Sequence, residues 1–138
     1  MKNAPPAHDS RIKFRYLAAH DVLLIHVDWP IETLEDIADW TRAFQDYFAR
    51  QDQGRKMDMI IELSKFSVAT RVRAAFGEAR AKVLKAYAGR SYRVNLDASA
   101  RVAMYTSRVL HGAEANDFPT IDDALAQLKA DRATSTGK

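Results

Sequence analysis

The sequence predicts an α/β domain with a mixed central sheet of about four or five strands, an opening β-hairpin and about four helices. Two patterns favour this class. The chain contains short segments that are wholly apolar or alternate apolar with polar residues, which is typical of strands. Between the later ones lie segments with apolar residues at three- and four-residue steps, which is typical of helices. In addition, 138 residues with a hydrophobic share of 47% suffice for one core. The later strands are therefore expected to pair in parallel, through right-handed crossovers.

The chain opens with two segments of strand character. Ile12, Phe14 and Tyr16 alternate with basic residues, which is the pattern of a half-buried strand. The run VLLIHVDW is almost wholly apolar, as in a more central strand, and Pro30 ends it. Because the link between the two segments is short, we expect an antiparallel hairpin that turns near residues 19–21.

Helical and strand patterns then alternate to the end of the chain. The clearest amphipathic helix covers about residues 34–50, with Thr33 as its expected N-cap. MDMIIEL predicts a buried strand, and a second helix is expected from Val72 to Gly89. The strand SYRVNL, a helix from Ser99, the short strand FPTI and the helix DDALAQLKA complete the order β-β-α-β-α-β-α-β-α. Within the helix from Ser99, RVAMYTS is also compatible with extended structure.

One domain is expected at residues 11–130, between disordered tails at residues 1–10 and 131–138, which lack apolar periodicity. The N-terminus has no apolar run typical of a signal peptide, and VLLI is too short to span a membrane. Cysteine is absent, which excludes disulfides and thiolate chemistry. We therefore expect a cytoplasmic protein without a membrane span.

The charges are distributed unevenly along the chain. Residues 28–46 hold six acidic side chains and one basic one, whereas residues 71–108 hold nine basic side chains and two acidic ones. Such asymmetry indicates either an anionic partner or two oppositely charged helices with solvated faces. We favour solvated faces. Nucleic acid is not expected as a partner, because the aromatic residues fall on core stripes and not among the bases.

Three segments together resemble the STAS domain family, which joins sulphate transporters with bacterial, SpoIIAA-like anti-sigma-factor antagonists. They are the hairpin IKFRYLAAHDVLLIHV, the strand end IIEL that leads through a short loop into a helix, and the C-terminal FPTIDDALAQL. The resemblance covers about residues 11–129 and implies a STAS fold and a regulatory role through a protein partner. Antagonists of the partner-switching type carry an Asp-Ser-Ser-Gly-like loop whose serine is phosphorylated. Here the loop reads SVATRVR and has no Asp-Ser pair.

The candidate phosphorylation or interaction site is the loop from Ser64 to Thr70 with the first turn of the next helix. A phosphate on Thr70 would lie at a helix N-terminus, where Arg71 and Arg73 would add charge-assisted hydrogen bonds. The alternative, which we favour, is that Thr70 is only the N-cap of that helix. Likewise, Ser64 and Ser67 are either modification sites or turn residues that bond their own backbone.

No enzyme or metal signature is found. The histidines have no metal-ligand spacing, G-x-S-x-G is absent, and the five glycines are isolated, so no phosphate-binding loop is formed. No catalytic residue, metal or cofactor is therefore predicted. The expected function is that of a non-enzymatic STAS-like regulatory or protein–protein interaction module, and a homodimer is compatible with it.

One alternative function uses the same scaffold differently. A small-molecule or lipid binding domain would need a cavity between the first helix and the sheet, lined by aromatic residues. The candidates are Trp29, Trp40, Phe44 and Tyr47, whose spacing is also that of an ordinary core. An enzyme with an unfamiliar site is a third hypothesis, because fold alone does not fix function.

Overall fold

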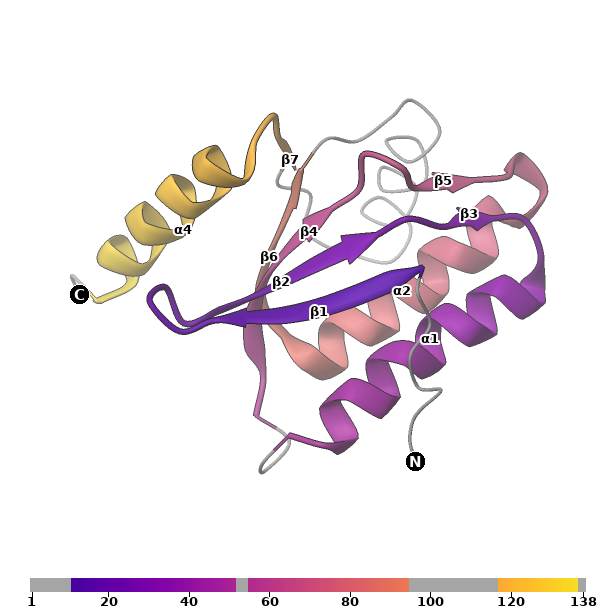
Figure 1. The fold of residues 1–138 in the computed structure, drawn as a ribbon, viewed down its shortest axis with the longest axis horizontal. Coiled ribbons are helices and arrows are strands. Elements are labelled where there is room, and N and C mark those ends of the chain that lie inside the picture. The colour runs from indigo at the N-terminus through magenta and orange to yellow at the C-terminus, as the bar shows by residue number, and fades with distance from the viewer. Residues whose placement is uncertain (1–10, 52–54, 95–116, 137–138) are drawn as a thin grey trace.

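A five-stranded mixed sheet forms the centre of the computed structural model, which describes residues 11–51, 55–94 and 117–136 (Figure 1). The first two strands pair antiparallel and the others parallel, as the sequence predicts. In spatial order the strands are β1 (Ile12–Leu17), β2 (Val22–Val27), β4 (Met57–Glu62), β6 (Ala88–Val94) and β7 (Asp117–Phe118).

Helices lie on both faces of this sheet. Two of them, α1 (Leu34–Ala49) and α2 (Arg73–Tyr87), pack on one face, and α4 (Ile121–Thr136) packs on the other (Figure 1). The α/β class is therefore confirmed. The helix expected from Ser99 lies outside the described residues. The sequence did not predict a second, two-stranded sheet, formed by β3 (Pro30–Ile31) and β5 (Ser67–Val68).

The hairpin between β1 and β2 turns where the sequence predicts. The backbone N–H of His20 donates to the carbonyl of Leu17 at 3.0 Å, and that of Asp21 donates to Ala18 at 3.4 Å. Asp21 has a φ of 50°. Aspartate tolerates this left-handed conformation better than most residues with a side chain, which suits it to the turn.

Local sequence fixes the start of α1. The Thr33 hydroxyl oxygen accepts from the backbone N–H of Asp36 at 3.0 Å, which confirms Thr33 as the N-cap. In return, the Asp36 carboxylate accepts from the backbone N–H groups of Glu32 at 2.9 Å and Thr33 at 3.1 Å. This is a capping box, with reciprocal bonds that satisfy donors left free at a helix end. These bonds, led by that from Glu32, lower the pKa of Asp36.

We expect Asp36→Asn to lower the free energy of unfolding by about 1 kcal/mol at neutral pH. Because the folded pKa lies below the ordinary value of 3.8, this contribution is present above pH 3.8 and is lost as the pH falls through the lowered pKa. Urea unfolding at pH 7 and pH 3 measures the difference. Glu35→Gln removes a carboxylate from the same turn but no capping bond, so an equal effect of the two substitutions would contradict the prediction.

The aromatic residues considered as a cavity lining belong to the core between α1 and the sheet. The ring of Trp40 lies 4.8 Å from that of Phe44 and 4.9 Å from that of Phe76 on α2. Phe14 of β1 stacks on Tyr47 at 4.5 Å and meets Phe44 edge-on at 5.3 Å. These rings thus pack against one another as in an ordinary core, which is the interpretation that their spacing also allowed. Trp29 is fully buried as well, and the Arg11 guanidinium lies 3.8 Å from the centre of its ring.

The predicted C-terminal tail is wrong from residue 131 to residue 136, because α4 continues to Thr136. Its apolar contacts end at Leu128, which is where the sequence pattern stops. Beyond that point the helix is held by polar contacts of Asp131 and Arg132 with distant segments. The spacing of apolar residues carries no information about polar contacts with distant segments, so the sequence alone suggested a disordered tail.

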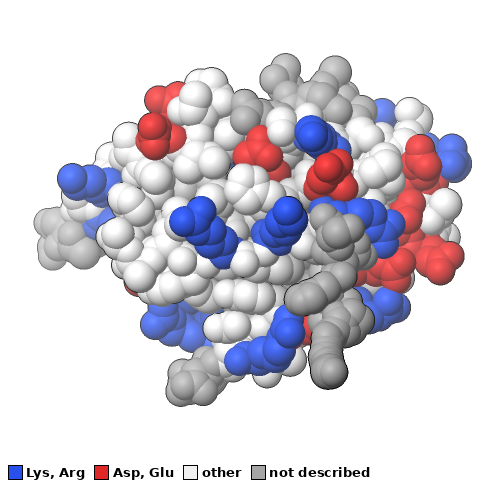
Figure 2. Space-filling model, viewed as in Figure 1, with Lys and Arg blue, Asp and Glu red and all other residues white. Residues whose placement is uncertain are grey.

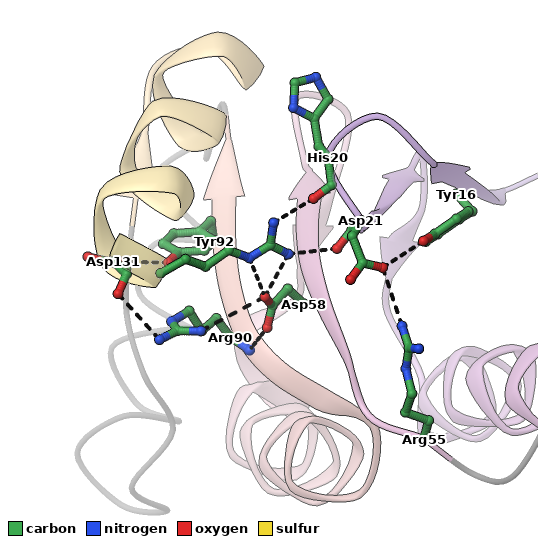
Figure 3. Close-up of polar contacts among 9 residues, drawn as sticks. Tyr16, His20, Asp21, Arg55, Asp58, Arg90, Tyr92 and Asp131 are labelled. Atoms are coloured by element: carbon green, nitrogen blue, oxygen red, sulfur yellow. Dashed lines mark hydrogen bonds and ion pairs between the residues drawn. The ribbon is translucent and has the colours of Figure 1, made fainter. Parts of the chain in front are cut away.

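A group of five polar residues fastens this end of α4 to the sheet, and we call it the α4 clasp (Figure 3). Arg132 donates from Nε and a terminal nitrogen to the Asp58 carboxylate at 3.1 and 2.9 Å. Asp58 also accepts from the backbone N–H of Arg90 at 2.7 Å. The Tyr92 hydroxyl donates to Asp131, and burial followed by this bond raises the pKa of Tyr92. The clasp comprises Asp58, Arg90, Tyr92, Asp131 and Arg132.

The clasp also reaches the turn of the opening hairpin. The terminal nitrogens of Arg132 donate to the backbone carbonyls of His20 and Asp21, each at 2.6 Å. The Asp21 carboxylate in turn accepts from the Tyr16 hydroxyl at 2.6 Å and pairs with Arg55 at 3.3 Å. The fork of one guanidinium therefore joins α4, β4 and the hairpin, a geometry that lysine cannot reproduce.

Two arginines of the basic region are buried, which corrects the expectation that this region shows its charges to solvent. Arg80 of α2 is 2% exposed and Arg93 of β6 is fully buried. Nε of Arg93 donates to the Asp117 carboxylate at 2.9 Å. Burial and the nearby Arg93 lower the pKa of Arg80 to about 9, against the attraction of Asp117. These arginines are thus part of the interior and contribute little to the surface field.

Candidate functional site

The segment between β4 and α2 is held firmly at both ends. After β4, the backbone N–H of Leu63 donates to the carbonyl of Val94 at 2.8 Å, and that of Phe66 donates to Leu63 at 3.1 Å. Phe66 and Val68 are 1% and 2% exposed. Two apolar anchors within a short loop leave it little freedom, so the side chains between them are presented in fixed positions.

The small sheet adds a second attachment. β5 runs parallel to β3, in a register that places Ser67 beside Pro30. The backbone N–H of Ser67 donates to the carbonyl of Trp29 at 3.3 Å, and that of Ala69 donates to Ile31 at 2.8 Å. This pairing brings the segments that lead into α1 and α2 to the same end of the central sheet (Figure 1).

The structure places the five predicted site residues in different surroundings. Ser64 is exposed, and its backbone N–H donates to the Glu62 carboxylate at 3.3 Å. Ser67 is half-buried within β5. Thr70 and Arg71 are exposed, whereas Arg73 is half-buried and donates to the Thr70 hydroxyl oxygen at 3.2 Å. Among these five residues, a side-chain hydrogen bond joins Arg73 to Thr70.

The interpretation of Thr70 as the N-cap of α2 is wrong. The turn η2 (Thr70–Val72) is a 3-10 helix that precedes α2, and its N-cap is Ala69, without a side-chain bond. The N-cap of α2 itself is Val72, which is 6% exposed and packs in the core. Burial of Val72 thus decides where α2 begins. The Thr70 hydroxyl oxygen makes no capping bond to α2 and accepts a hydrogen bond from the Arg73 guanidinium.

The exposed candidate residues of the loop are polar or basic, and an exposed apolar side chain lies at the start of α1. Arg71 extends into solvent, and Nε of Arg73 is buried and without a hydrogen-bond partner in the described part of the chain. Leu34, at the start of α1, is 67% exposed. An exposed hydroxyl that is bonded to one guanidinium group, with a second exposed arginine next to it in the sequence, suits an anionic group. Sequence reasoning did not single out Leu34, because its position suits an amphipathic helix.

Within residues 11–51, 55–94 and 117–136, no group of three or more histidine, cysteine, aspartate or glutamate side chains could hold a metal ion. None of the helices in those ranges is long and apolar enough to cross a bilayer.

No protein-family model matches the sequence, and no curated protein matches it. Solved structures do match. The anti-sigma factor antagonist SpoIIAA, in its unphosphorylated form, is similar with a TM-score of 0.56 and 13% identity, over 86% of this chain and 96% of that one. A serine-to-glutamate variant of RsbS from Moorella thermoacetica gives a TM-score of 0.53 and 10% identity, over 87% and 98% of the two chains.

A similar fold forms part of a much longer chain. SLC26A9 matches with a TM-score of 0.53 and 12% identity, over 85% of this chain but only 21% of its own length. All three likenesses cover most of this chain, and all three identities are low. The opening hairpin, the mixed sheet and the helices on its two faces are thus those of a STAS-like fold.

Proposed function

We propose that this protein is a non-enzymatic regulatory module that binds a protein partner through the loop site. The loop site comprises Ser64, Ser67, Thr70, Arg71 and Arg73. The similarity to SpoIIAA, named an anti-sigma factor antagonist, supports a regulatory module, and it extends over nearly the whole of that protein. Fold similarity does not fix function by itself, so the proposal depends on the chemistry of the loop.

The observation that carries the proposal is the contact between Thr70 and Arg73. An exposed hydroxyl oxygen lies 3.2 Å from a guanidinium nitrogen, and the exposed Arg71 is its sequence neighbour. A phosphoryl group on Thr70, or a carboxylate of a partner at the same place, would gain charge-assisted hydrogen bonds from these cations. The loop site therefore suits an acidic surface on the partner, with an affinity that responds to negative charge on Thr70.

We expect Arg71→Glu to weaken retention of the partner by about tenfold or more, because it replaces an attraction with a repulsion at the contact. The proteins retained from an extract by the immobilised wild-type chain are quantified by mass spectrometry and compared with those retained by the variant. Lys85→Glu is the matched control, since it makes the same charge change at the exposed last turn of α2. Equal retention by wild type and Arg71→Glu would contradict the proposal.

The response to charge on the loop is tested separately. We expect Thr70→Asp to reduce binding of the same partner, because the new carboxylate would neutralise Arg73 from within the chain. Thr70→Val removes the hydroxyl without adding charge and should bind as wild type does. Ser67→Asp probes the half-buried position in β5. If Thr70→Asp and Thr70→Val bind equally well, the site is a contact surface without a charge-sensitive residue at this position.

A further inference from the structure

The outer edge of β1 is a second candidate surface for a partner. In the described sheet β1 is the terminal strand and pairs only with β2, over six residues without a bulge. The N–H and C=O groups along a sheet edge can pair with a further strand. Natural proteins often shield such an edge, so its side chains decide whether it is open to a partner.

The register of the hairpin shows which backbone groups are available. Arg11 lies opposite Asp28, and the Asp28 N–H donates to the Arg11 carbonyl at 2.8 Å, so this is a hydrogen-bonded pair. Hydrogen-bonded and non-hydrogen-bonded pairs alternate along an antiparallel ladder. The N–H and C=O groups of Ile12, Phe14 and Tyr16 are therefore directed away from β2, toward the open edge.

The side chains of β1 divide into a basic row and an aromatic row. Lys13 and Arg15 are exposed on one face, where Figure 2 shows basic side chains over the position of β1. They line an open groove of about 700 Å³ that continues past His26 to Ser64 and Lys65 and also contains the acidic Asp28 and Glu62. On the opposite face lie the half-buried Phe14 and the 45% exposed Tyr16. A strand added beside β1 would thus meet cations on one face and aromatic rings on the other.

The same charges argue against a second copy of this chain as the occupant. Antiparallel pairing of two β1 strands would set Lys13 and Arg15 against the same residues of the other copy, and like charges opposite each other destabilise a strand pair. Carboxylates at alternate positions would instead face Lys13 and Arg15. Apolar side chains at the intervening positions would contact Phe14 and Tyr16.

We propose that β1 receives an extended acidic segment of a partner protein as an additional strand. The segment alternates acidic with apolar residues, and its backbone pairs with Ile12, Phe14 and Tyr16. Main-chain hydrogen bonds supply affinity in this mode of recognition, and alternate side chains supply specificity. The backbone groups that would pair lie on β1 and not in the loop site, although the groove beside Lys13 and Arg15 reaches Ser64. The two proposals are therefore tested by different substitutions.

The probe is the fluorescein-labelled, end-blocked peptide GDVEIEVG, and its charge-reversed counterpart GKVKIKVG is the control. We expect fluorescence anisotropy to show saturable binding of the acidic peptide only. Binding should weaken as salt is added, since exposed charges are screened. Backbone amides of Phe14 and Tyr16 should exchange quickly with solvent in the free protein and become protected in the complex. The amide of Arg15, which faces β2, should be protected in both states.

A backbone substitution separates strand pairing from simple charge attraction. Tyr16→Pro removes an N–H that faces the open edge, and proline is tolerated at such edge positions. Tyr16→Val loses the same hydroxyl but keeps the N–H. We expect Tyr16→Pro to bind the peptide about tenfold more weakly than Tyr16→Val, the loss of roughly one to two backbone hydrogen bonds. Circular dichroism checks that both variants are folded. If Tyr16→Pro is unfolded, the hydrogen-exchange measurement on the wild-type complex tests strand pairing instead.

The charges are tested by the double substitution Lys13→Glu with Arg15→Glu, which should abolish binding of the acidic peptide. The matched control is Lys82→Glu with Lys85→Glu on the exposed face of α2, which should leave the affinity for the acidic peptide unchanged. Arg71→Glu should also bind the peptide normally, so failure of the loop site and failure of this edge are distinguishable. Binding without protection of the Phe14 and Tyr16 amides, or no binding of either peptide, would overturn the proposal and indicate that the charges only shield the edge.

Discussion

Trp40→Ala is expected to lower the free energy of unfolding by about 3–5 kcal/mol, which is a large part of the stability of a domain this size. Trp40 is 4% exposed and contacts Phe44 on its own helix and Phe76 on α2. Removal of the indole therefore leaves a cavity between the two helices and the sheet and loses the ring contacts. Urea unfolding followed by circular dichroism measures the change at constant pH.

Leu34→Ala, in the first turn of the same helix, is the control for Trp40→Ala. Leu34 is 67% exposed, so its truncation should change stability by no more than about 0.5 kcal/mol. The slope of the unfolding curve should be unaffected in both variants, because it reports the surface exposed on unfolding. If the two substitutions cost the same, the arrangement of α1 against the sheet is not the one described.

Asp58→Ala is expected to cost about 3 kcal/mol, because it removes the acceptor for three hydrogen bonds in the α4 clasp. Those bonds come from Nε and a terminal nitrogen of Arg132 and from the backbone N–H of Arg90. Without Asp58, two partly buried guanidinium groups lose their carboxylate partner, although Arg132 keeps its bonds to the His20 and Asp21 carbonyls. Hydrogen exchange should then show faster exchange in the last turns of α4, whereas α1 should keep its protection.

Two further substitutions test whether the loss of stability in Asp58→Ala comes from the α4 clasp. Asp46→Ala removes an exposed carboxylate from α1 and should alter stability by less than about 0.5 kcal/mol. Gly89→Ala would place its Cβ only 2.6 Å from Oδ1 of Asp58, so the carboxylate must shift and a loss of about 1–2 kcal/mol is expected. Equal stability of Asp58→Ala and Asp46→Ala would show that the clasp does not hold α4.

The elements that the sequence predicts well are those fixed by their own neighbours. Alternation in the first strand and the apolar run of the second are confirmed as β1 and β2. The predicted helix over about residues 34–50 agrees with α1 (Leu34–Ala49), and Thr33 caps it as expected. In these cases the deciding interactions span a few residues, so their pattern can be read from the chain directly.

The candidate site was less accessible to sequence reasoning. The chain predicts a loop at residues 64–70, yet the two-residue strands of the small sheet are too short to give a periodic signal. Thr70 looked like a cap because a hydroxylated residue precedes an apolar helix, but burial of Val72 moves the start of α2 to Arg73. Tertiary packing overrides local propensity at such boundaries.

The sequence by itself determined the order of the central strands with α1, α2 and α4, the hairpin and the cap of α1, because periodicity and capping act between near neighbours. Only the tertiary structure decided that Arg80 and Arg93 are buried, that α4 continues past residue 130, and that β1 is an open edge. Arg132 and Asp58, for instance, are 74 residues apart in the chain and 2.9 Å apart in the clasp. The strength of a polar contact depends on distance in space and on exclusion of water, and neither quantity is encoded in any short stretch of sequence.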